Sequence, residues 1–140
     1  MIARRSERAY LESMPANTHE NWKIVAFLAT TKPDESRKFF AEVLQLKLVE
    51  ESPFAIVFEH RGTTLRVQKA PQHTPSPHTA LGFCVPDVPA EVQALQARGV
   101  PLERFAGLDQ DAHGIWLAPS GTRVAWFKDP DGNLLSFSDA

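Results

Sequence analysis

The sequence predicts an α+β fold built from two copies of one β-α-β-β-β module. Twice along the chain a buried strand pattern is followed by a short helix pattern, and each helix is followed by further strand-like segments. The gaps between those strands are short, which is typical of antiparallel hairpins and argues against a doubly wound parallel sheet. A Pro-rich linker, residues 70–77, separates the two copies.

Length and composition exclude several classes of protein. A chain of 140 residues is long enough for one domain with a sizeable core. Its net charge is −2, with both signs interspersed, so we expect no nucleic-acid partner. The longest apolar run, residues 24–29, is far shorter than the roughly 20 residues that cross a bilayer, so we expect no membrane partner.

The cysteine and the first residues bear on location. Cys84 is the only cysteine, which excludes an internal disulfide and a thiolate metal cluster. Charged residues follow Arg4 and Arg5 where a secretory signal requires an apolar segment. We therefore expect a cytoplasmic protein in which residues 1–22 form an N-terminal extension outside the core, with at most a short helix at residues 4–14.

The first module begins at residue 23. Residues 23–30 are β-branched and aromatic, as in a buried strand. A helix is predicted to follow, capped by Thr31, with Pro33 in its first turn and an apolar stripe over residues 39–44. Three strands are then predicted at residues 47–51, 54–60 and 63–69.

The second module repeats this order. A strand at residues 79–85 precedes a helix that is capped by Asp87 and stops at Gly99. Further strands are predicted at residues 101–105, 114–118, 122–128 and 133–138. The segment Asp-Pro-Asp-Gly-Asn, residues 129–133, has the composition of the turn between the last two.

Three features together resemble the vicinal oxygen chelate superfamily, which contains glyoxalase I, bleomycin-resistance proteins, fosfomycin-resistance enzymes and extradiol dioxygenases. They are the duplicated module, the helix text of residues 36–44 and the closing Phe-Lys-Asp-Pro-Asp-Gly-Asn of residues 127–133. The resemblance covers residues 23–138, a single domain with modules 23–69 and 78–138. It implies curled mixed sheets that form a shared cavity, whose wall carries up to four metal ligands, and it implies a homodimer.

The resemblance also locates the metal-ligand positions. They fall on Val25, Arg66, Ala80 and Ser136. Valine and alanine offer no lone pair, and a guanidinium repels a cation, so this set does not bind a divalent metal. We therefore expect no cofactor and no metal ligand, catalytic residues stay unknown, and whether the chain is an enzyme stays open. The alternative is a metal-dependent enzyme of the lyase or dioxygenase class, with a displaced site that uses His78 with His60 or Glu103.

If the four positions that the resemblance implies face the cavity, strand alternation predicts which other side chains line it. The predicted ligand-binding residues are Phe27, Arg66, Gln68, Cys84, Val124, Trp126 and Ser136. Arg66 has two interpretations. Its guanidinium either donates paired hydrogen bonds to an anionic ligand or forms a structural ion pair with Glu59, Glu103 or Asp139. Trp126 is predicted either to stack on a ligand or to pack in the core.

Three functions follow from this set. The first is a metal-free protein of the bleomycin-resistance type that binds a partly apolar, anionic or aromatic small molecule. The second is the metal-dependent enzyme described above. The third is a dimeric scaffold with a vestigial cavity, which contact between Phe27 and Trp126 would support. Whether the modules pair within one chain or between two chains is left open by the sequence.

Overall fold

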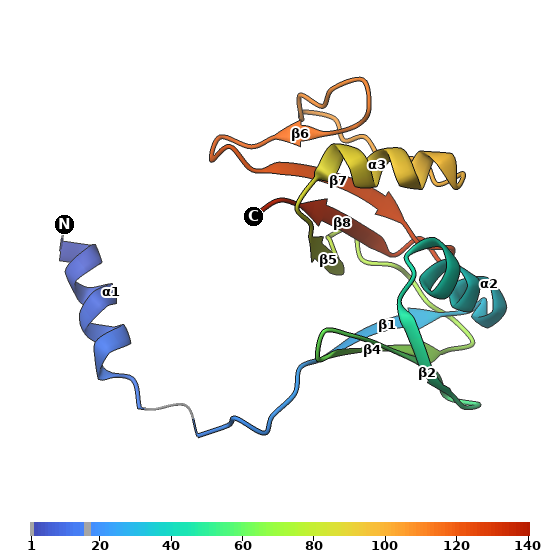
Figure 1. Cartoon of the computed structure of the whole chain (residues 1–140), viewed down its shortest axis with the longest axis horizontal. Helices are drawn as coiled ribbons and strands as arrows, with labels where there is room; N and C mark the ends of the chain where they lie inside the picture. Colours follow the sequence, from blue (N-terminus) through green and yellow to red (C-terminus); the bar gives the residue numbers. More distant parts are fainter. Residues whose placement is uncertain (1, 16–17) are drawn as a thin grey trace.

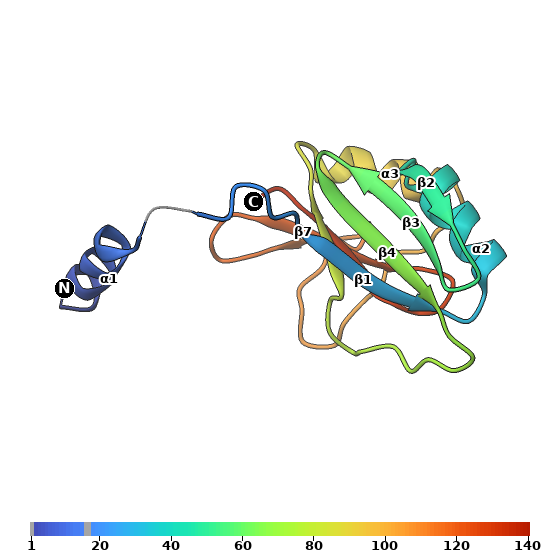
Figure 2. The same ribbon diagram turned by 90° about the horizontal axis from the view of Figure 1, so that it is seen from below.

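The computed structural model describes residues 2–15 and 18–140 of the chain, and both predicted modules are present. The helical elements are α1 (Ile2–Ser13), α2 (Pro33–Lys38), the π-helical turn η1 (Phe39–Val43) that continues it, and α3 (Val88–Ala97). Figures 1 and 2 show α1 apart from the two sheets. No helix within residues 2–15 and 18–140 is long and apolar enough to cross a bilayer.

The first module forms sheet A. Its strands are β1 (Val25–Thr30), β2 (Lys47–Glu51), β3 (Ala55–His60) and β4 (Thr63–Lys69). Their order in the sheet is β1-β4-β3-β2; β1 runs parallel to β4, and the other pairs are antiparallel. The first strand therefore lies beside the last one, because the helix after β1 carries the chain to the opposite edge.

The second module forms sheet B on the same plan. Its strands are β5 (Leu81–Cys84), β6 (Trp116–Leu117), β7 (Arg123–Lys128) and β8 (Leu134–Ser138). The order is β5-β8-β7-β6, with β5 parallel to β8. The fold is thus α+β, with two mixed four-stranded sheets that are not joined into one.

One hydrophobic core joins buried side chains of both sheets. Each sheet turns one face toward it, and the helices supply further side chains. Representative buried members are Leu28, Val67 and Phe58 of sheet A, Phe127 and Leu135 of sheet B, Phe40 of η1 and Val92 of α3. Because side chains alternate along a strand, the other face of each sheet points away from this core. We call these the outward faces of sheets A and B.

Three local predictions need correction. Thr31 does not cap α2; the residue before the helix is Lys32, whose N–H donates to Thr30 Oγ1, while Thr31 contacts Asp131. Residues 101–105 form a single bridge, Leu102 to Phe127, because side chains farther along the loop satisfy much of the backbone there. The strand expected at residues 114–118 is shortened to Trp116–Leu117.

Candidate functional site

The outward face of sheet A holds three of the predicted ligand-binding residues. Phe27, Arg66 and Val57 form one row across β1, β4 and β3, and Gln68 lies in the next row. Figure 2 looks onto this face, and none of the helices and strands described in residues 2–15 and 18–140 lies over it. Phe27 is 51% exposed, and the Arg66 guanidinium carbon lies 5.7 Å from the centroid of its ring. A guanidinium over an aromatic ring at this distance is a cation–π pair.

The three carboxylates considered as structural partners of Arg66 are all paired with other cations. Glu59 contacts Lys23 Nζ at 2.6 Å, Glu103 contacts Lys128 Nζ at 3.3 Å, and Asp139 contacts Arg123 Nη1 at 3.5 Å. No carboxylate within the described part of the chain lies within 4.0 Å of the Arg66 guanidinium. Arg66 therefore keeps its charge unpaired on an open face.

The outward face of sheet B holds the other four predicted residues. Trp126 and Ser136 lie in one row with Gly82, and Val124 and Cys84 lie in the next. A Cβ placed on Gly82 would approach Ser136 Oγ to 3.0 Å, so the absence of a side chain there leaves room for the hydroxyl. Cys84 is exposed, whereas Ser136 is only 8% exposed.

Trp126 is covered by the loop before β6. Its ring contacts Phe105 at a centroid distance of 5.2 Å and Trp116 at 6.1 Å, and its indole N–H donates to Thr79 Oγ1. Gln110 braces the loop by accepting from the N–H of Phe105 and donating to two carbonyls of the same loop. This face is an aromatic wall, in contrast to the charged face of sheet A.

Within one chain the two groups of predicted residues lie on different surfaces. Phe27, Arg66 and Gln68 belong to sheet A, while Cys84, Val124, Trp126 and Ser136 belong to sheet B, and the shared core separates the sheets. The aromatic contacts of the described residues do not join Phe27 to Trp126. Among the strands found in residues 18–140, β1 pairs only with β4, and β5 pairs only with β8. β1 and β5 are therefore edge strands of their sheets.

The residues present do not fit the metal site of the related enzymes. Val25 and Arg66 lie on sheet A, Ala80 precedes β5, and Ser136 lies on β8. Ser136 alone offers an uncharged oxygen, which is too little for a divalent cation. No group of three or more His, Cys, Asp or Glu side chains placed to hold a metal occurs in residues 2–15 and 18–140. The alternative set of His78 with His60 or Glu103 therefore does not form such a group in the structure.

The Asp-Pro-Asp-Gly-Asn turn has a role that its sequence did not predict. Asp131 accepts hydrogen bonds from the Thr30 and Thr31 hydroxyls and from the Thr31 N–H, in the other module. Asn133, 3% exposed, donates from Nδ2 to the Ala29 carbonyl and to Asp129 Oδ2. The turn thus joins the second module to the end of β1.

Two further side chains, His73 and Asp129, form hydrogen bonds with Asn133 of this turn. Because both acceptors of Asn133 Nδ2 are oxygens, its Oδ1 must accept, so Nε2 of His73 in the linker donates the 2.6 Å hydrogen bond between them. Burial raises the pKa of Asp129, although hydrogen bonds from Asn133 partly oppose that effect. Sequence reasoning identified a turn here, and only the long-range pairing revealed a contact between modules.

The fold agrees with comparisons to known proteins. Residues 23–137 match the family model described as Glyoxalase/Bleomycin resistance protein/Dioxygenase superfamily, so the chain belongs to that superfamily. A search of the curated proteins finds no match.

Solved structures show the same fold. Lactoylglutathione lyase from Agrobacterium tumefaciens has a TM-score of 0.66 at 17% identity, covering 89% of this chain and 94% of that one. A bleomycin resistance determinant encoded on the transposon Tn5 has a TM-score of 0.64 at 18% identity, covering 84% and 96%. A superfamily member from Sphaerobacter thermophilus has a TM-score of 0.65 at 18% identity, covering 84% and 95%.

Proposed function

We propose that this protein is a cytoplasmic, metal-free member of the superfamily that binds an anionic, partly apolar or aromatic small molecule at Arg66. The observation that carries the proposal is the unpaired guanidinium on an open sheet face, held over the ring of Phe27. An arginine offers a planar fork of donors that matches a carboxylate or phosphate, and the neighbouring ring and valine suit an apolar body.

A second copy of the chain completes the cavity in this proposal. The outward face of sheet A supplies the charge, and the outward face of sheet B of the other copy supplies the aromatic wall around Trp126. Support comes from the edge of β1, where Trp22 is 75% and Ile24 76% exposed. Exposed apolar side chains beside an unpaired strand edge favour pairing with another chain. A vestigial scaffold is disfavoured because Phe27 and Trp126 do not fill one another's space.

The test starts with calorimetric titration of a panel of aromatic carboxylates and aryl phosphates. Arg66→Ala is expected to weaken binding by about 1.5–3 kcal/mol, the range for a hydrogen bond to a charged group. Arg66→Lys keeps the charge but loses the fork, so a smaller loss is expected. Arg61→Asn, which removes an exposed cation from the turn between β3 and β4, is the matched control.

Two further measurements decide the remaining parts. Light scattering is expected to give a dimer that Ile24→Lys dissociates and that Phe54→Lys leaves intact, since Phe54 is 79% exposed but lies outside the β1 edge. Elemental analysis and thermal-shift titration with nickel, manganese, iron(II) and zinc test the metal-free part. Stoichiometric metal, equal affinity of wild type and Arg66→Ala, or a monomer would each overturn the corresponding part.

A further inference from the structure

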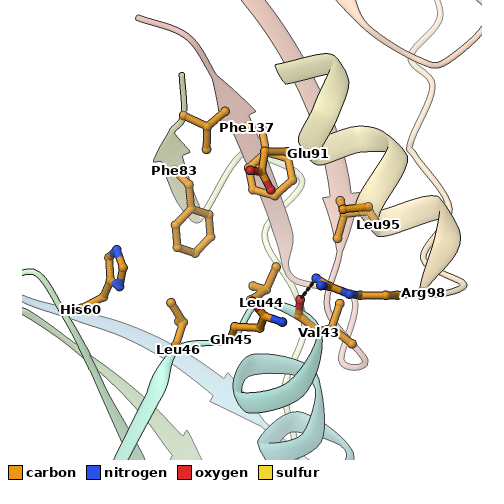
Figure 3. Close-up of a pocket in the computed structure, with 12 residues that line it drawn as sticks. Val43, Leu44, Gln45, Leu46, His60, Phe83, Glu91, Leu95, Arg98 and Phe137 are labelled. Carbon is orange, nitrogen blue, oxygen red and sulfur yellow. Dashed lines mark hydrogen bonds between the residues drawn. The ribbon is translucent and has the colours of Figure 1, made fainter. Parts of the chain in front are cut away.

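A separate cavity of about 500 Å³ lies between the two modules, on the core side of the sheets (Figure 3). The C-terminal side of η1, strand β5 and helix α3 form its walls. This volume is in the range of small-molecule sites in proteins. Neither Arg66 nor Trp126 lines this cavity, so it is distinct from the proposed site on the outward faces.

The middle of the cavity is apolar. Phe83 and Phe137 face it with ring centroids 6.1 Å apart, and Leu95 of α3 and Leu44 after η1 lie across from them in Figure 3. Phe137 and Leu95 both belong to the buried core. Such a surface favours a chain of methylene groups or an aromatic body.

Two opposite charges lie toward the ends of this wall. Glu91 and Arg98 are both on the α3 side and are seven residues apart, which corresponds to about 10 Å of helix rise. Neither forms an ion pair, with each other or with any other side chain in the described ranges. Arg98 Nη1 donates to the Val43 carbonyl at 2.7 Å, which fixes the guanidinium at the cavity and leaves other N–H donors available.

The backbone beside Arg98 departs from regular helix geometry. η1 is a π-helical turn, and Gln45, which follows it, has a φ of 59°. Figure 3 shows the Gln45 side chain among the groups around the cavity, with His60 of β3 at its edge. Irregular turns of this kind are found at functional sites, where they direct side chains that a regular helix would turn away.

We infer that this cavity binds an elongated dipolar molecule, with an ammonium group at Glu91, a carboxylate at Arg98 and an apolar middle. The two charges of the wall are complementary to such a ligand, whereas a simple amine would face Arg98 and a simple acid would face Glu91. The separation of the charges suits an ω-amino acid or a short peptide and is too long for an α-amino acid.

The probes are 8-aminooctanoate, octylamine and octanoate, which share one chain length and differ only in their charged ends. In calorimetric titrations, 8-aminooctanoate is expected to bind at least tenfold more tightly than either of the others, as one charge-assisted hydrogen bond predicts. Nuclear Overhauser contacts from its methylene protons to the rings of Phe83 and Phe137 are expected to locate it in the cavity.

Separate variants test the charge of Glu91 and the volume of the cavity. Glu91→Gln is expected to weaken the binding of 8-aminooctanoate and of octylamine about tenfold or more. The same substitution is expected not to weaken the binding of octanoate. Glu42→Gln, on the exposed side of η1, is the matched control and is expected to change nothing. Ala94→Phe, which fills the cavity and keeps both charges, is expected to abolish binding, with a retained amide spectrum as the check on folding.

Three results would overturn the inference: no saturable binding of 8-aminooctanoate at about 10 mM, roughly four orders of magnitude above a Kd of about 1 μM; equal affinity for the acid and the dipolar probe; or an unchanged affinity in Glu91→Gln. Arg66→Ala is expected to leave this binding unchanged. Failure here is therefore distinguishable from failure of the proposed function.

Discussion

The last hairpin turns of the two modules occupy corresponding places, yet among the described residues only the second one forms side-chain hydrogen bonds to the other module. Arg61 and Gly62 between β3 and β4 are exposed. The turn between β7 and β8 instead bonds to the end of β1 through Asp131 and Asn133. A duplicated plan therefore places two equivalent turns, and one of them adds hydrogen bonds between the modules to the packing of their shared core.

The outward faces show a second contrast. Arg66 and Ser136 correspond to each other on the last strand of each module, but Arg66 is exposed on an uncovered sheet and Ser136 is 8% exposed beside a covered tryptophan. The difference arises because the second module has a long loop before β6 that lies against Trp126, while the first has only short hairpins. One face is thus suited to hold charge and the other to supply an apolar wall.

The largest predicted effect tests the contrast between the turns. Asn133→Ala removes two donated hydrogen bonds and one accepted one at a buried position, and we expect it to lower the free energy of unfolding by about 3 kcal/mol. Urea denaturation followed by circular dichroism measures this. Arg61→Asn in the corresponding turn tolerates the left-handed backbone and is expected to cost less than about 0.5 kcal/mol. Equal losses in the two turns would contradict the assignment of the joining role.

The next effect tests the contrast between the faces. Trp126→Ala removes a partly buried ring that contacts Phe105 and Trp116, so we expect a loss of about 2 kcal/mol in unfolding free energy, below the range for a fully buried tryptophan. Phe27→Ala is expected to cost less than about 0.5 kcal/mol at concentrations where the chain is monomeric, because its ring is half exposed. A large loss for Phe27→Ala in the monomer would mean that sheet A is covered in solution.

Local sequence patterns predicted most of the fold. The strands of sheet A and the Asp87 cap of α3 follow from alternation and capping rules. The loop at residues 101–115 was mispredicted because its order comes from side chains such as Gln110 and Asp111, which bond to backbone groups several residues away. Secondary-structure propensities do not predict such hydrogen bonds between side chains and the backbone.

The candidate site was predictable in composition but not in arrangement. Alternation identified which side chains leave the core, including Arg66 and Trp126. It could not show that Glu59, Glu103 and Asp139 each have another cation, because those pairings join residues far apart in the chain. The cavity beside α3 was missed for the same reason: Leu44 and His60 of the first module meet Glu91 of the second only when the two modules pack.

The smallest predicted effect compares one carboxylate from each module. In the first, hydrogen bonds from Arg37 and then Lys69 lower the pKa of Glu51 to about 2; in the second, burial raises that of Asp129. A lowered folded-state pKa stabilises the fold above the unfolded value of 4.5, and this contribution is lost as the pH falls toward 2. A raised pKa acts in the opposite sense, so the contribution of Asp129 falls as the pH rises through its folded-state value.

Thermal unfolding between pH 2 and pH 7 measures the contribution of Glu51. Glu51→Gln is expected to be less stable than wild type at neutral pH and to converge with it toward pH 2, by a small amount because water screens a partly exposed ion pair. Glu50→Gln, on the same strand and without an ion pair in the described residues, is expected to follow wild type throughout. A gap between Glu51→Gln and wild type that persists at pH 2 would show that Glu51 acts through packing, and the charge contrast between the modules would then rest on Asp129 alone.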